Sequence, residues 1–512
     1  MSSFIESADS SEIGYEETDV VVAGASAGLV AAIKAADLGA KTICLDKLDP
    51  MDAEKIIPVA PAGIPGGWGN CTSKSGGAWY YMSNIAPDNP AMGIASIGSG
   101  GLKDLMVEFD EKTTTLQRYK DLSRGRTDIE VAKTLFERSK CDAKWLREEV
   151  GLLQEKASGV IAGKTARGRH ILPDLYEAAK KKGVNILFKH KALKLLSDNR
   201  GRVTGIRAMT PQGLKDYRAK ATILATGSFE GNHEMKLKYL GPKKAYMMLT
   251  GCPTNVGDGL RMATEMGAML VNMTVTHIRT LDAVVYSMGP SRSIPNIYTR
   301  GLYINMNGKR FVDENCASDD IANSIAYQPD LRVYLIFDEK IKTEFSREYN
   351  NYIAKTIQDA YRPATEEELM IKANTIEELA TKIAVAPSSL EATVKEFNAA
   401  VKDGKALAIP YPKMERAVKI EQPPFYAHPV TCALNHPLGG LKINDRGQVI
   451  NSEDEIIPGL YACGAIVNIH FGEMIEIHGI HNYVSSYTVF AGLAYSFTTA
   501  CLAAENAVKE LE

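Results

Sequence analysis

The chain has 512 residues, of which 45% are hydrophobic and 24% charged, and these values are typical of a globular protein with two or more domains. Its formal net charge of −3 gives no electrostatic reason to expect nucleic acid or an anionic membrane as a partner. No apolar run reaches the ~18 residues of a membrane-spanning helix. The eight cysteines include no C-x-x-C pair, which favours reduced thiols in a cytoplasmic protein and no metal site.

The chain begins with an acidic stretch, residues 1–17, which we expect to be a flexible lead-in. The first basic residue is Lys34, so the positively charged start of an export signal is absent. This also favours a cytoplasmic location.

Residues 19–46 form the clearest local pattern, a predicted β-α-β unit. The β-branched residues 20–22 suit a strand that is buried on both faces, and a turn of small residues follows at 24–28. A helix is predicted at 29–38, and a second strand ends in Asp46. Such a unit binds a dinucleotide pyrophosphate at its helix N-terminus and a ribose at the acid. The full G-x-G-x-x-G is absent, so the turn alone fits a plain packing turn equally well.

The remaining chain alternates between helical and strand patterns. A Gly-rich loop at 66–77 suits close approach of a backbone to a ligand, but also an irregular surface loop. Periodicity predicts two helices within 127–150, a helix at 172–182, strands at 184–188, 203–209 and 221–227, and helices at 365–382, 388–401 and 489–504. The alternation indicates an α/β protein.

Several motifs together resemble the fumarate reductase and 3-ketosteroid dehydrogenase superfamily of FAD enzymes. They occur in family order between about residues 18 and 500, and they are Gly183-Val-Asn-Ile, Arg202-Val-Thr-Gly-Ile, Ala221-Thr-Ile-Leu-Ala-Thr-Gly-Ser-Phe-Glu-Gly-Asn232, Gly257-Asp-Gly-Leu260, Gly308-Lys-Arg-Phe-Val-Asp-Glu314, His436-Pro-Leu-Gly-Gly440 and Pro458-Gly-Leu-Tyr-Ala-Cys-Gly464. The stretch 239–258, followed by His277 and Asp282, is most similar to the tricarballylate dehydrogenase branch.

The resemblance implies a two-domain flavoprotein of the α/β class. Its Rossmann-like FAD-binding domain would consist of residues 18–272 and 436–512. An α+β capping domain, which covers the substrate in such proteins, would be inserted between them at 273–435.

The resemblance also implies which residues contact FAD. The pyrophosphate would lie at the glycine turn, and the adenosine ribose at the acid that ends the second strand. The implied set is Gly24, Ala25, Ser26, Ala27 and Gly28 for the pyrophosphate; Asp46 for the ribose; Asn70, Thr72, Ser75, Gly76 and Gly77 along the ribityl chain and flavin; Ala192 for the adenine; Thr226 and Gly227 for the phosphates; Asp258 near the flavin; Gly464 for the ribityl group; and Ser485 and Ser486 for the flavin pyrimidine. Lys47 and Gly69, next to these residues in the sequence, are further candidates for cofactor binding. The family's usual Glu after Gly464 is Ala465 here, so one ribose contact is missing.

The resemblance locates the proton carrier, and there this chain departs from the family pattern. Fumarate reductases have an Arg, and steroid dehydrogenases a Tyr, four residues after the acid that matches Glu314. This chain has Ser318 at that position, and a hydroxyl is too weak an acid for the role without a partner base. The relay acid expected three residues before Arg300 is replaced by Ile297. An intact fumarate reductase mechanism is therefore not expected.

Other catalytic candidates follow from the same resemblance. His436 and Arg300 match parts of the substrate site of fumarate reductases, and His277 matches a histidine of the tricarballylate branch. Tyr483 matches a carbonyl-binding tyrosine. His481 is a further candidate for proton transfer, because imidazole titrates near neutral pH. Structural interpretations stay open: a turn cap for His436, interdomain hydrogen bonds for His481 and a core aromatic for Tyr483.

These observations predict an FAD-dependent oxidoreductase that acts on a carbon–carbon bond next to a carbonyl group. Some relatives have a carboxylate-binding Arg in the segment that contains Tyr483. The absence of this Arg here favours desaturation of a ketone or reduction of an enone, and the direction is left open. The alternatives are a reductase of an unsaturated carboxylate, a flavoprotein subunit that passes electrons to a separate partner, and a binding module that has lost FAD.

Overall fold

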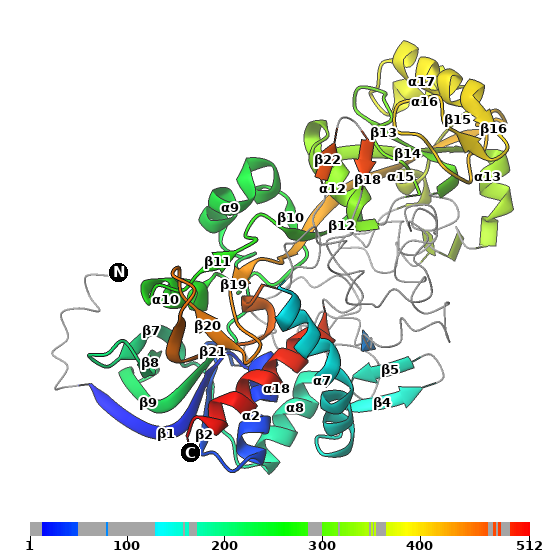
Figure 1. The fold of residues 1–512 in the computed structure, drawn as a ribbon. Coiled ribbons are helices and arrows are strands. Elements are labelled where there is room, and N and C mark those ends of the chain that lie inside the picture. Colours follow the sequence, from blue (N-terminus) through cyan, green and yellow to red (C-terminus); the bar gives the residue numbers. More distant parts are fainter. Residues whose placement is uncertain are drawn as a thin grey trace.

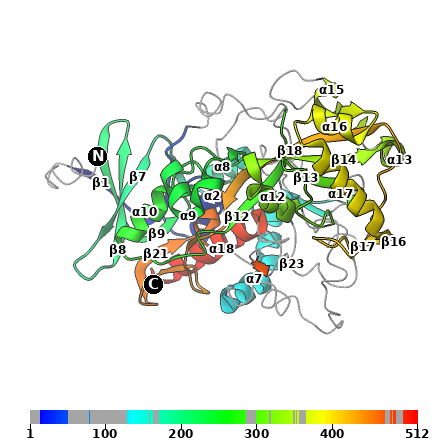
Figure 2. The same ribbon diagram turned by 90° about the horizontal axis from the view of Figure 1, so that it is seen from above.

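The computed structural model describes residues 13–49, 78–79, 128–156, 159–162, 171–284, 299–315, 318–347, 350–351, 353–354, 365–468, 475–477, 480–482 and 492–511. They form two lobes, each with its own hydrophobic core (Figures 1 and 2). One core draws residues from both ends of the chain, and the other draws them from the middle. We name them the FAD lobe and the capping lobe, after the expectation from the sequence; the predicted boundaries at 273 and 436 stay predictions.

The FAD lobe is built on an eight-stranded sheet with the central order β20-β21-β9-β1-β2-β6, to which β8 and then β7 are joined through β9. Strands β1, β2, β6, β9 and β21 run parallel. The bounds are β1 Gly14–Ala23, β2 Thr42–Leu45, β6 Asn185–Leu187, β7 Lys191–Ser197, β8 Val203–Thr210, β9 Gly213–Leu224, β20 Gln448–Ile450 and β21 Ile456–Ala462. Parallel strands buried on both faces need apolar residues throughout, as the fully buried Val20, Val21 and Val22 show.

Four helices pack together beside this sheet (Figure 1). They are α2 Ala27–Asp37, α7 Ile129–Glu148, α8 Ile171–Lys181 and α18 Leu493–Lys509. An ionic network joins three of them, because Glu505 lies 3.1 Å from Lys34 and 3.0 Å from Arg138. Smaller elements of this lobe are the sheet β3 Ala78–Trp79, β4 Leu153–Lys156 and β5 Gly159–Ala162, helix α10 Asp258–Glu265, the pair β11 Leu270–Val271 and β19 Gly440–Leu441, and the 3-10 turn η5 Gly464–Ile466.

The capping lobe is organised around one long strand, β18 Phe425–Pro437, which extends from the outer part of this lobe toward the FAD lobe (Figure 1). β18 pairs with β10 Met248–Leu249, β12 Thr276–Asp282, β14 Arg332–Asp338 and β15 Ile371–Ala373, and β14 pairs with β13 Leu302–Asn305. The other elements of this lobe are α12 Ser318–Ala326, η4 Pro329–Leu331, α13 Glu339–Glu344, α15 Glu366–Leu369, α16 Ile376–Lys382, α17 Pro387–Ala400, and the pair β16 Val401–Lys402 and β17 Lys405–Ala406. Helix α9 His233–Ala245 packs against the core of the FAD lobe, and its Leu240 packs against both cores. Strands β22 Ile475–Ile477 and β23 Ile480–Asn482 pair with each other.

The structure corrects three of the predicted elements. Residues 127–150 contain one helix, α7, rather than two, since no Gly or Pro interrupts it. The predicted helix at 365–382 is broken into α15, β15 and α16, because Ile371–Ala373 pairs with β18 and the Thr375 hydroxyl caps a new helix at Glu378 N. The expected lead-in is wrong for its last residues, since β1 starts at Gly14 and pairs there with Lys215.

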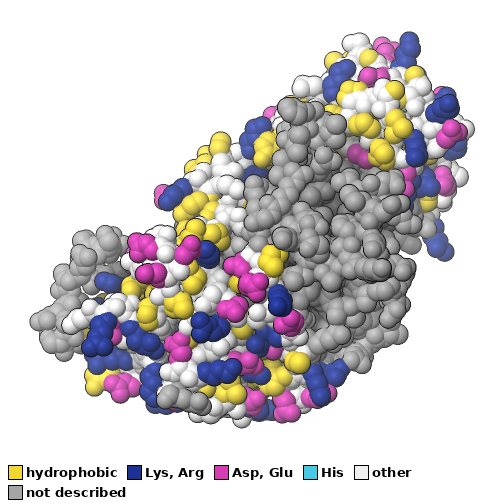
Figure 3. Space-filling view, viewed as in Figure 1, with side chains coloured by type: hydrophobic (Ala, Val, Ile, Leu, Met, Phe, Trp, Pro, Cys, Tyr) yellow, Lys and Arg dark blue, Asp and Glu magenta, His cyan; other side chains and the backbone are white. Residues whose placement is uncertain are grey.

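The elements predicted at 29–38, 172–182, 184–188, 203–209 and 388–401 are confirmed within about two residues of their bounds. The strand predicted at 221–227 is longer at its start, since β9 begins at Gly213, and the helix predicted at 489–504 is described from Leu493 to Lys509. Among the described residues, no helix is both long and apolar enough to cross a membrane. On the face drawn in Figure 3, acidic and basic side chains are interspersed over the described surface. This distribution agrees with the nearly balanced charge of the chain.

Candidate active site and cofactor cleft

The turn between β1 and α2 needs glycine at two positions for packing reasons. Gly24 has φ +105°, and a Cβ there would lie 2.3 Å from the Ala225 carbonyl oxygen. A Cβ on Gly28 would lie 2.9 Å from a methyl group of Val22. Both contacts are shorter than van der Waals distance, so neither position tolerates a side chain. The positions between them carry Ala and Ser, and the turn forms without the full glycine motif.

A cleft opens at the carboxyl ends of the parallel strands, where ligands bind in this class of sheet. It encloses about 820 Å³, including space open to solvent. The start of α2 faces the cleft, and a helix N-terminus attracts anions such as a pyrophosphate. The predicted cofactor residues that line it are Gly24, Ala25, Ser26, Ala27, Asp46, Lys47, Ala192, Thr226, Gly227 and Asp258. They come from five separate stretches of sequence, which the fold brings to one place.

Asp46 ties the end of β2 to the glycine turn. Its Oδ2 accepts from Ala25 N at 2.7 Å, and its Oδ1 accepts from Leu48 N at 2.8 Å. Burial raises the pKa of this carboxyl group, although both hydrogen bonds favour the charged form. A carboxylate has about four acceptor positions, so Asp46 can hold the turn and also accept from a ribose hydroxyl. The ribose contact stays a prediction.

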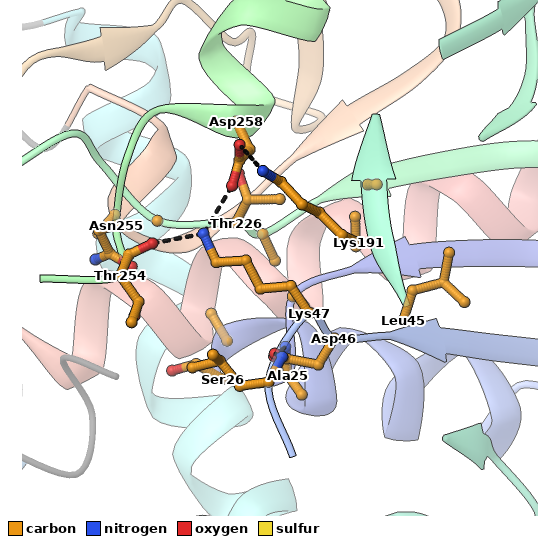
Figure 4. A pocket seen from close by; sticks show the side chains of 18 of the residues that line it. Ala25, Ser26, Leu45, Asp46, Lys47, Lys191, Thr226, Thr254, Asn255 and Asp258 are labelled. Atoms are coloured by element: carbon orange, nitrogen blue, oxygen red, sulfur yellow. Dashed lines mark hydrogen bonds and ion pairs between the residues drawn. The ribbon is translucent and has the colours of Figure 1, made fainter. Parts of the chain in front are cut away.

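Lys47 bridges two sides of the cleft (Figure 4). Its Nζ lies 2.7 Å from Asp258 Oδ2 and also donates to the Thr254 carbonyl oxygen. Lys191 and Arg261 each lie 3.5 Å from the other oxygen of Asp258. Burial opposes ionisation of Asp258, but these positive charges outweigh it and lower its pKa. The structure thus places Asp258 beside Lys47, at the end of the cleft assigned to the ribose, and a contact of Asp258 with the flavin remains a prediction.

Two other predicted glycines hold loops against this cleft. Gly227 has φ +79°, and a Cβ there would lie 2.8 Å from the Asn255 side chain. Gly464 has φ +75°, and its Cβ would lie 2.8 Å from that of Ala27. The neighbouring Thr226 hydroxyl accepts from Gly259 N at 3.1 Å, which joins β9 to α10. Close approach of these backbones explains why glycine is needed there.

His277 and His436 face each other across two strands of the capping sheet. They are register partners on β12 and β18, and their ring centroids are 5.4 Å apart. His277 is fully buried. Burial, then His277 and Arg279, hold the pKa of His436 well below its usual value. We call these two residues the histidine pair.

Arg279 is a site residue that the sequence reasoning missed. Its Nε donates to His277 Nε2 at 3.0 Å. The signal was available in the alternation of the strand, since residues 277 and 279 lie on the same face of β12. Recognising it required knowing that His436 lies on that face as well, which depends on the pairing of β12 with β18.

Arg300 lies beside Glu344 and Phe345 of the capping lobe. Its guanidinium lies 3.5 Å from Glu344 and 4.6 Å from the centre of the Phe345 ring. The carbonyl oxygen of the adjacent Gly301 accepts from the fully buried Lys413 at 2.9 Å. A substrate contact of Arg300 therefore remains a prediction.

The Gly-Lys-Arg-Phe-Val-Asp-Glu motif has a structural role. Glu314 receives two hydrogen bonds from Arg310, at 3.0 and 2.8 Å, and lies 3.3 Å from Lys413. All three side chains are almost completely buried. Their charges satisfy one another in the core of the capping lobe.

Some predicted site residues cannot be placed in contact with the others. Ser318 is the first residue of α12, and His481 belongs to β23; their side chains are not described. The predicted residues Gly69, Asn70, Thr72, Ser75, Gly76, Gly77, Tyr483, Ser485 and Ser486 lie outside the described part of the chain. Their roles stay predictions.

The parallel sheet, the glycine turn and the cleft define a dinucleotide-binding protein of the two-domain flavoprotein class. The chain belongs to the FAD-binding domain family, whose profile matches residues 19–481. FAD is therefore its cofactor. The residues present fit this group. Gly24 and Gly28 form a turn without side chains at the start of α2. The cleft beside this turn combines the helix N-terminus with the ammonium groups of Lys47 and Lys191.

Comparison with known proteins confirms the superfamily. The chain is 28% identical to NADH:acrylate oxidoreductase of Vibrio harveyi over 89% of this chain and 48% of that protein. It is 26% identical to fumarate reductase (cytochrome) of Shewanella frigidimarina over 94% and 76%. The chain thus spans about half the length of the first relative and three quarters of the second.

A solved structure shows the same fold. The 3-ketosteroid Δ1-dehydrogenase from Sterolibacterium denitrificans superposes with a TM-score of 0.69 at 16% identity, covering 96% of this chain and 100% of that one. This likeness confirms the predicted two-domain flavoprotein architecture. The closer resemblance to the tricarballylate dehydrogenase branch stays a prediction.

Proposed function

We propose that this chain is an FAD-dependent oxidoreductase that adds or removes two hydrogens across a carbon–carbon bond conjugated to a carbonyl or carboxyl group. The observation that carries the proposal is the histidine pair: His436 lies near the end of β18, the strand that leads from the capping lobe toward the FAD lobe, and His277 lies opposite it on β12. Imidazole N–H groups can hold a carbonyl or carboxylate oxygen and so polarise the adjacent bond. The names of the two relatives given above refer to acrylate and to fumarate, and both compounds contain a carbon–carbon double bond conjugated to a carboxylate.

In this proposal, each group of residues has a separate task. When bound, FAD supplies two-electron hydride chemistry. The turn at Gly24 and the acid Asp46 hold and orient the adenosine and pyrophosphate end. The low pKa of His436 makes this residue neutral at physiological pH, so that it binds by hydrogen bonding rather than by charge. Tyr483 stays a proposed partner for the carbonyl oxygen, and Ser318 a proposed member of the proton-transfer group.

The test follows the flavin absorbance near 450 nm in the purified protein, loaded with FAD if needed. The enzyme is reduced with dithionite without oxygen and then mixed with acrylate, fumarate, cyclohexenone or a steroid enone. Reoxidation by at least one of them, and its loss in the double variant His277→Gln, His436→Gln, is the expected result. Reoxidation by none, together with no bleaching by saturated ketones, would contradict the proposal.

We also propose that electrons reach FAD from a separate electron-transfer partner or domain. The support is that the related oxidoreductases contain sequence beyond the part this chain matches. Slow reduction by NADH alone, compared with rapid reduction by a small viologen donor, is expected in a stopped-flow measurement. Rapid reduction by NADH alone would contradict it.

A cytoplasmic location remains a proposal as well. The described cysteines are all free thiols: Cys44, Cys141, Cys252, Cys432, Cys463 and Cys501. Free thiols are consistent with a reducing compartment. Fractionation of the native host cells would test the location, and recovery outside the cytoplasm would contradict it.

A further inference from the structure

Three side chains form a compact cluster on one face of the capping sheet. His277 and Arg279 are two residues apart on β12, so they point to the same side of the strand. His436 is the register partner of His277 on β18, which places its ring beside that of His277 at 5.4 Å. The register shifts between His277 and Ile278, and the extra residue is Asn435 on β18, so the alternation of β12 is preserved.

The hydrogen bond from Arg279 determines where the hydrogen of His277 lies. Arg279 Nε donates to His277 Nε2 at 3.0 Å. A guanidinium group has only donors and stays charged in proteins, so His277 Nε2 has to be the acceptor. A protonated imidazole has hydrogens on both nitrogens and cannot accept. The ring is therefore neutral and carries its hydrogen on Nδ1.

We propose that Arg279 is a positioning residue that fixes His277 as the neutral Nδ1–H tautomer, so that His277 offers an N–H donor at Nδ1 to an oxygen of the substrate. Arg279 acts through His277. The clause about the substrate rests on the proposed function, whereas the tautomer can be measured without any substrate.

The electrostatics of the cluster agree with this assignment. Burial, the neighbouring His277 and the positive charge of Arg279 all lower the pKa of His436. The groups that lower the pKa of His436 besides burial are His277 and Arg279, both on β12. A positive charge so close opposes a second one. Burial and these charges thus keep His436 neutral, and the hydrogen bond from Arg279 selects the neutral form of His277.

The charge and the shape of Arg279 make separable contributions. Its planar fork fixes the direction of the Nε–H bond, and a lysine would supply the charge without that geometry. Arg279→Lys therefore tests direction, and Arg279→Met removes both charge and donor. Arg332→Gln is the matched control, because Arg332 lies on β14 of the same sheet and bonds Tyr334 instead of a histidine.

The deciding measurement is nitrogen NMR of ¹⁵N-histidine-labelled holoprotein, with His277→Asn used to assign the signals. In the wild type, His277 Nε2 should have the shift of an unprotonated nitrogen and Nδ1 that of a protonated one, unchanged between about pH 6 and 8. Arg279→Met should move both signals toward tautomer-averaged values that change with pH, and Arg332→Gln should not. An Nε2–H tautomer or a charged His277 in the wild type overturns the proposal, as do unchanged signals in Arg279→Met.

The second arm uses whichever substrate the reoxidation assay accepts. Arg279→Met is expected to lower kcat/KM about 10- to 100-fold, with the flavin spectrum unchanged and partial recovery in Arg279→Lys. Unchanged kcat/KM in Arg279→Met overturns the link to the substrate. If no substrate is accepted, the proposed function fails, whereas the NMR result still decides the tautomer, so the two failures are distinguishable.

Discussion

The two lobes use buried charge in opposite ways. In the capping lobe, Glu314, Arg310 and Lys413 have side chains that are at most 5% exposed, and they satisfy one another inside the core. In the FAD lobe, the carboxylate of Asp258 is similarly buried, but its partners Lys47 and Lys191 are 24% and 45% exposed and line the cleft. In the capping lobe the charged side chains bind one another inside the core, whereas in the FAD lobe the two lysines line the cleft proposed to hold FAD. The comparison predicts that charge removal affects folding in one lobe and cofactor binding in the other.

The largest effect is expected from Glu314→Gln. It leaves Arg310 and Lys413 buried with no opposite charge between them, and breaking such a group costs about 3–5 kcal/mol of the free energy of unfolding. Urea denaturation should show this loss, while the Kd for FAD of the folded protein stays unchanged. The control is Glu421→Gln, whose carboxylate is 57% exposed beside Lys419. Equal effects of the two variants would show that the buried cluster has no special role.

The next effect concerns the glycine turn. Gly24→Ala places a Cβ 2.3 Å from a carbonyl oxygen at φ +105°, so both a clash and backbone strain arise, roughly 2–4 kcal/mol together. We expect loss of bound FAD and a lower denaturation midpoint. Gly39→Ala has the same kind of φ, +91°, but nothing within 4 Å, so only the backbone cost of about 1 kcal/mol should appear. Retention of FAD at wild-type levels in Gly24→Ala would contradict the assignment of the turn.

A smaller effect is expected from Lys47→Met, which tests whether charge in the cleft of the FAD lobe serves cofactor binding rather than folding. Asp258 loses its nearest cation, and the cleft loses one of its ammonium groups. FAD binding should weaken by about 1–3 kcal/mol, or roughly 5- to 150-fold in Kd, measured by quenching of flavin fluorescence. Lys220→Met, which removes an exposed pair with Asp19, is the control. If Lys47→Met lowers the free energy of unfolding more than it weakens FAD binding, the Lys47–Asp258 ion pair has a structural role like that of the buried cluster in the capping lobe.

The same variant makes a prediction about pH. The folded-state pKa of Asp258 is lowered, so its contribution to stability is present above the unfolded pKa of about 3.9 and is lost as the pH falls through the lower, folded value. The difference in unfolding free energy between the wild type and Lys47→Met should therefore be full at neutral pH and shrink below about pH 4. A difference that grows on acidification would give the opposite sign and contradict the assignment.

The FAD lobe could largely be predicted from sequence because its signals are local. The β-branched run before Gly24 and the acid at the end of β2 each lie within one β-α-β unit, and the structure has them in place. The capping lobe was harder. The helix predicted at 365–382 failed because β15 pairs with the distant β18, and Arg279 was missed because its importance depends on the same strand. Periodicity within a segment does not contain the register between segments.

The smallest expected effect comes from restoring a residue that the family pattern would have. Ala465 lines the cleft directly after Gly464, whose close contact with Ala27 fixes the backbone there. A glutamate at this position could accept from a ribose hydroxyl, and one solvent-exposed hydrogen bond contributes about 1 kcal/mol, or roughly fivefold in Kd. Ala465→Glu should therefore tighten FAD binding in a fluorescence titration, while Ala465→Gln should do so less. An unchanged or weaker Kd in Ala465→Glu would mean that the nearby Asp258 already repels a second carboxylate, and that the cleft has replaced the family contact with its own set of cations.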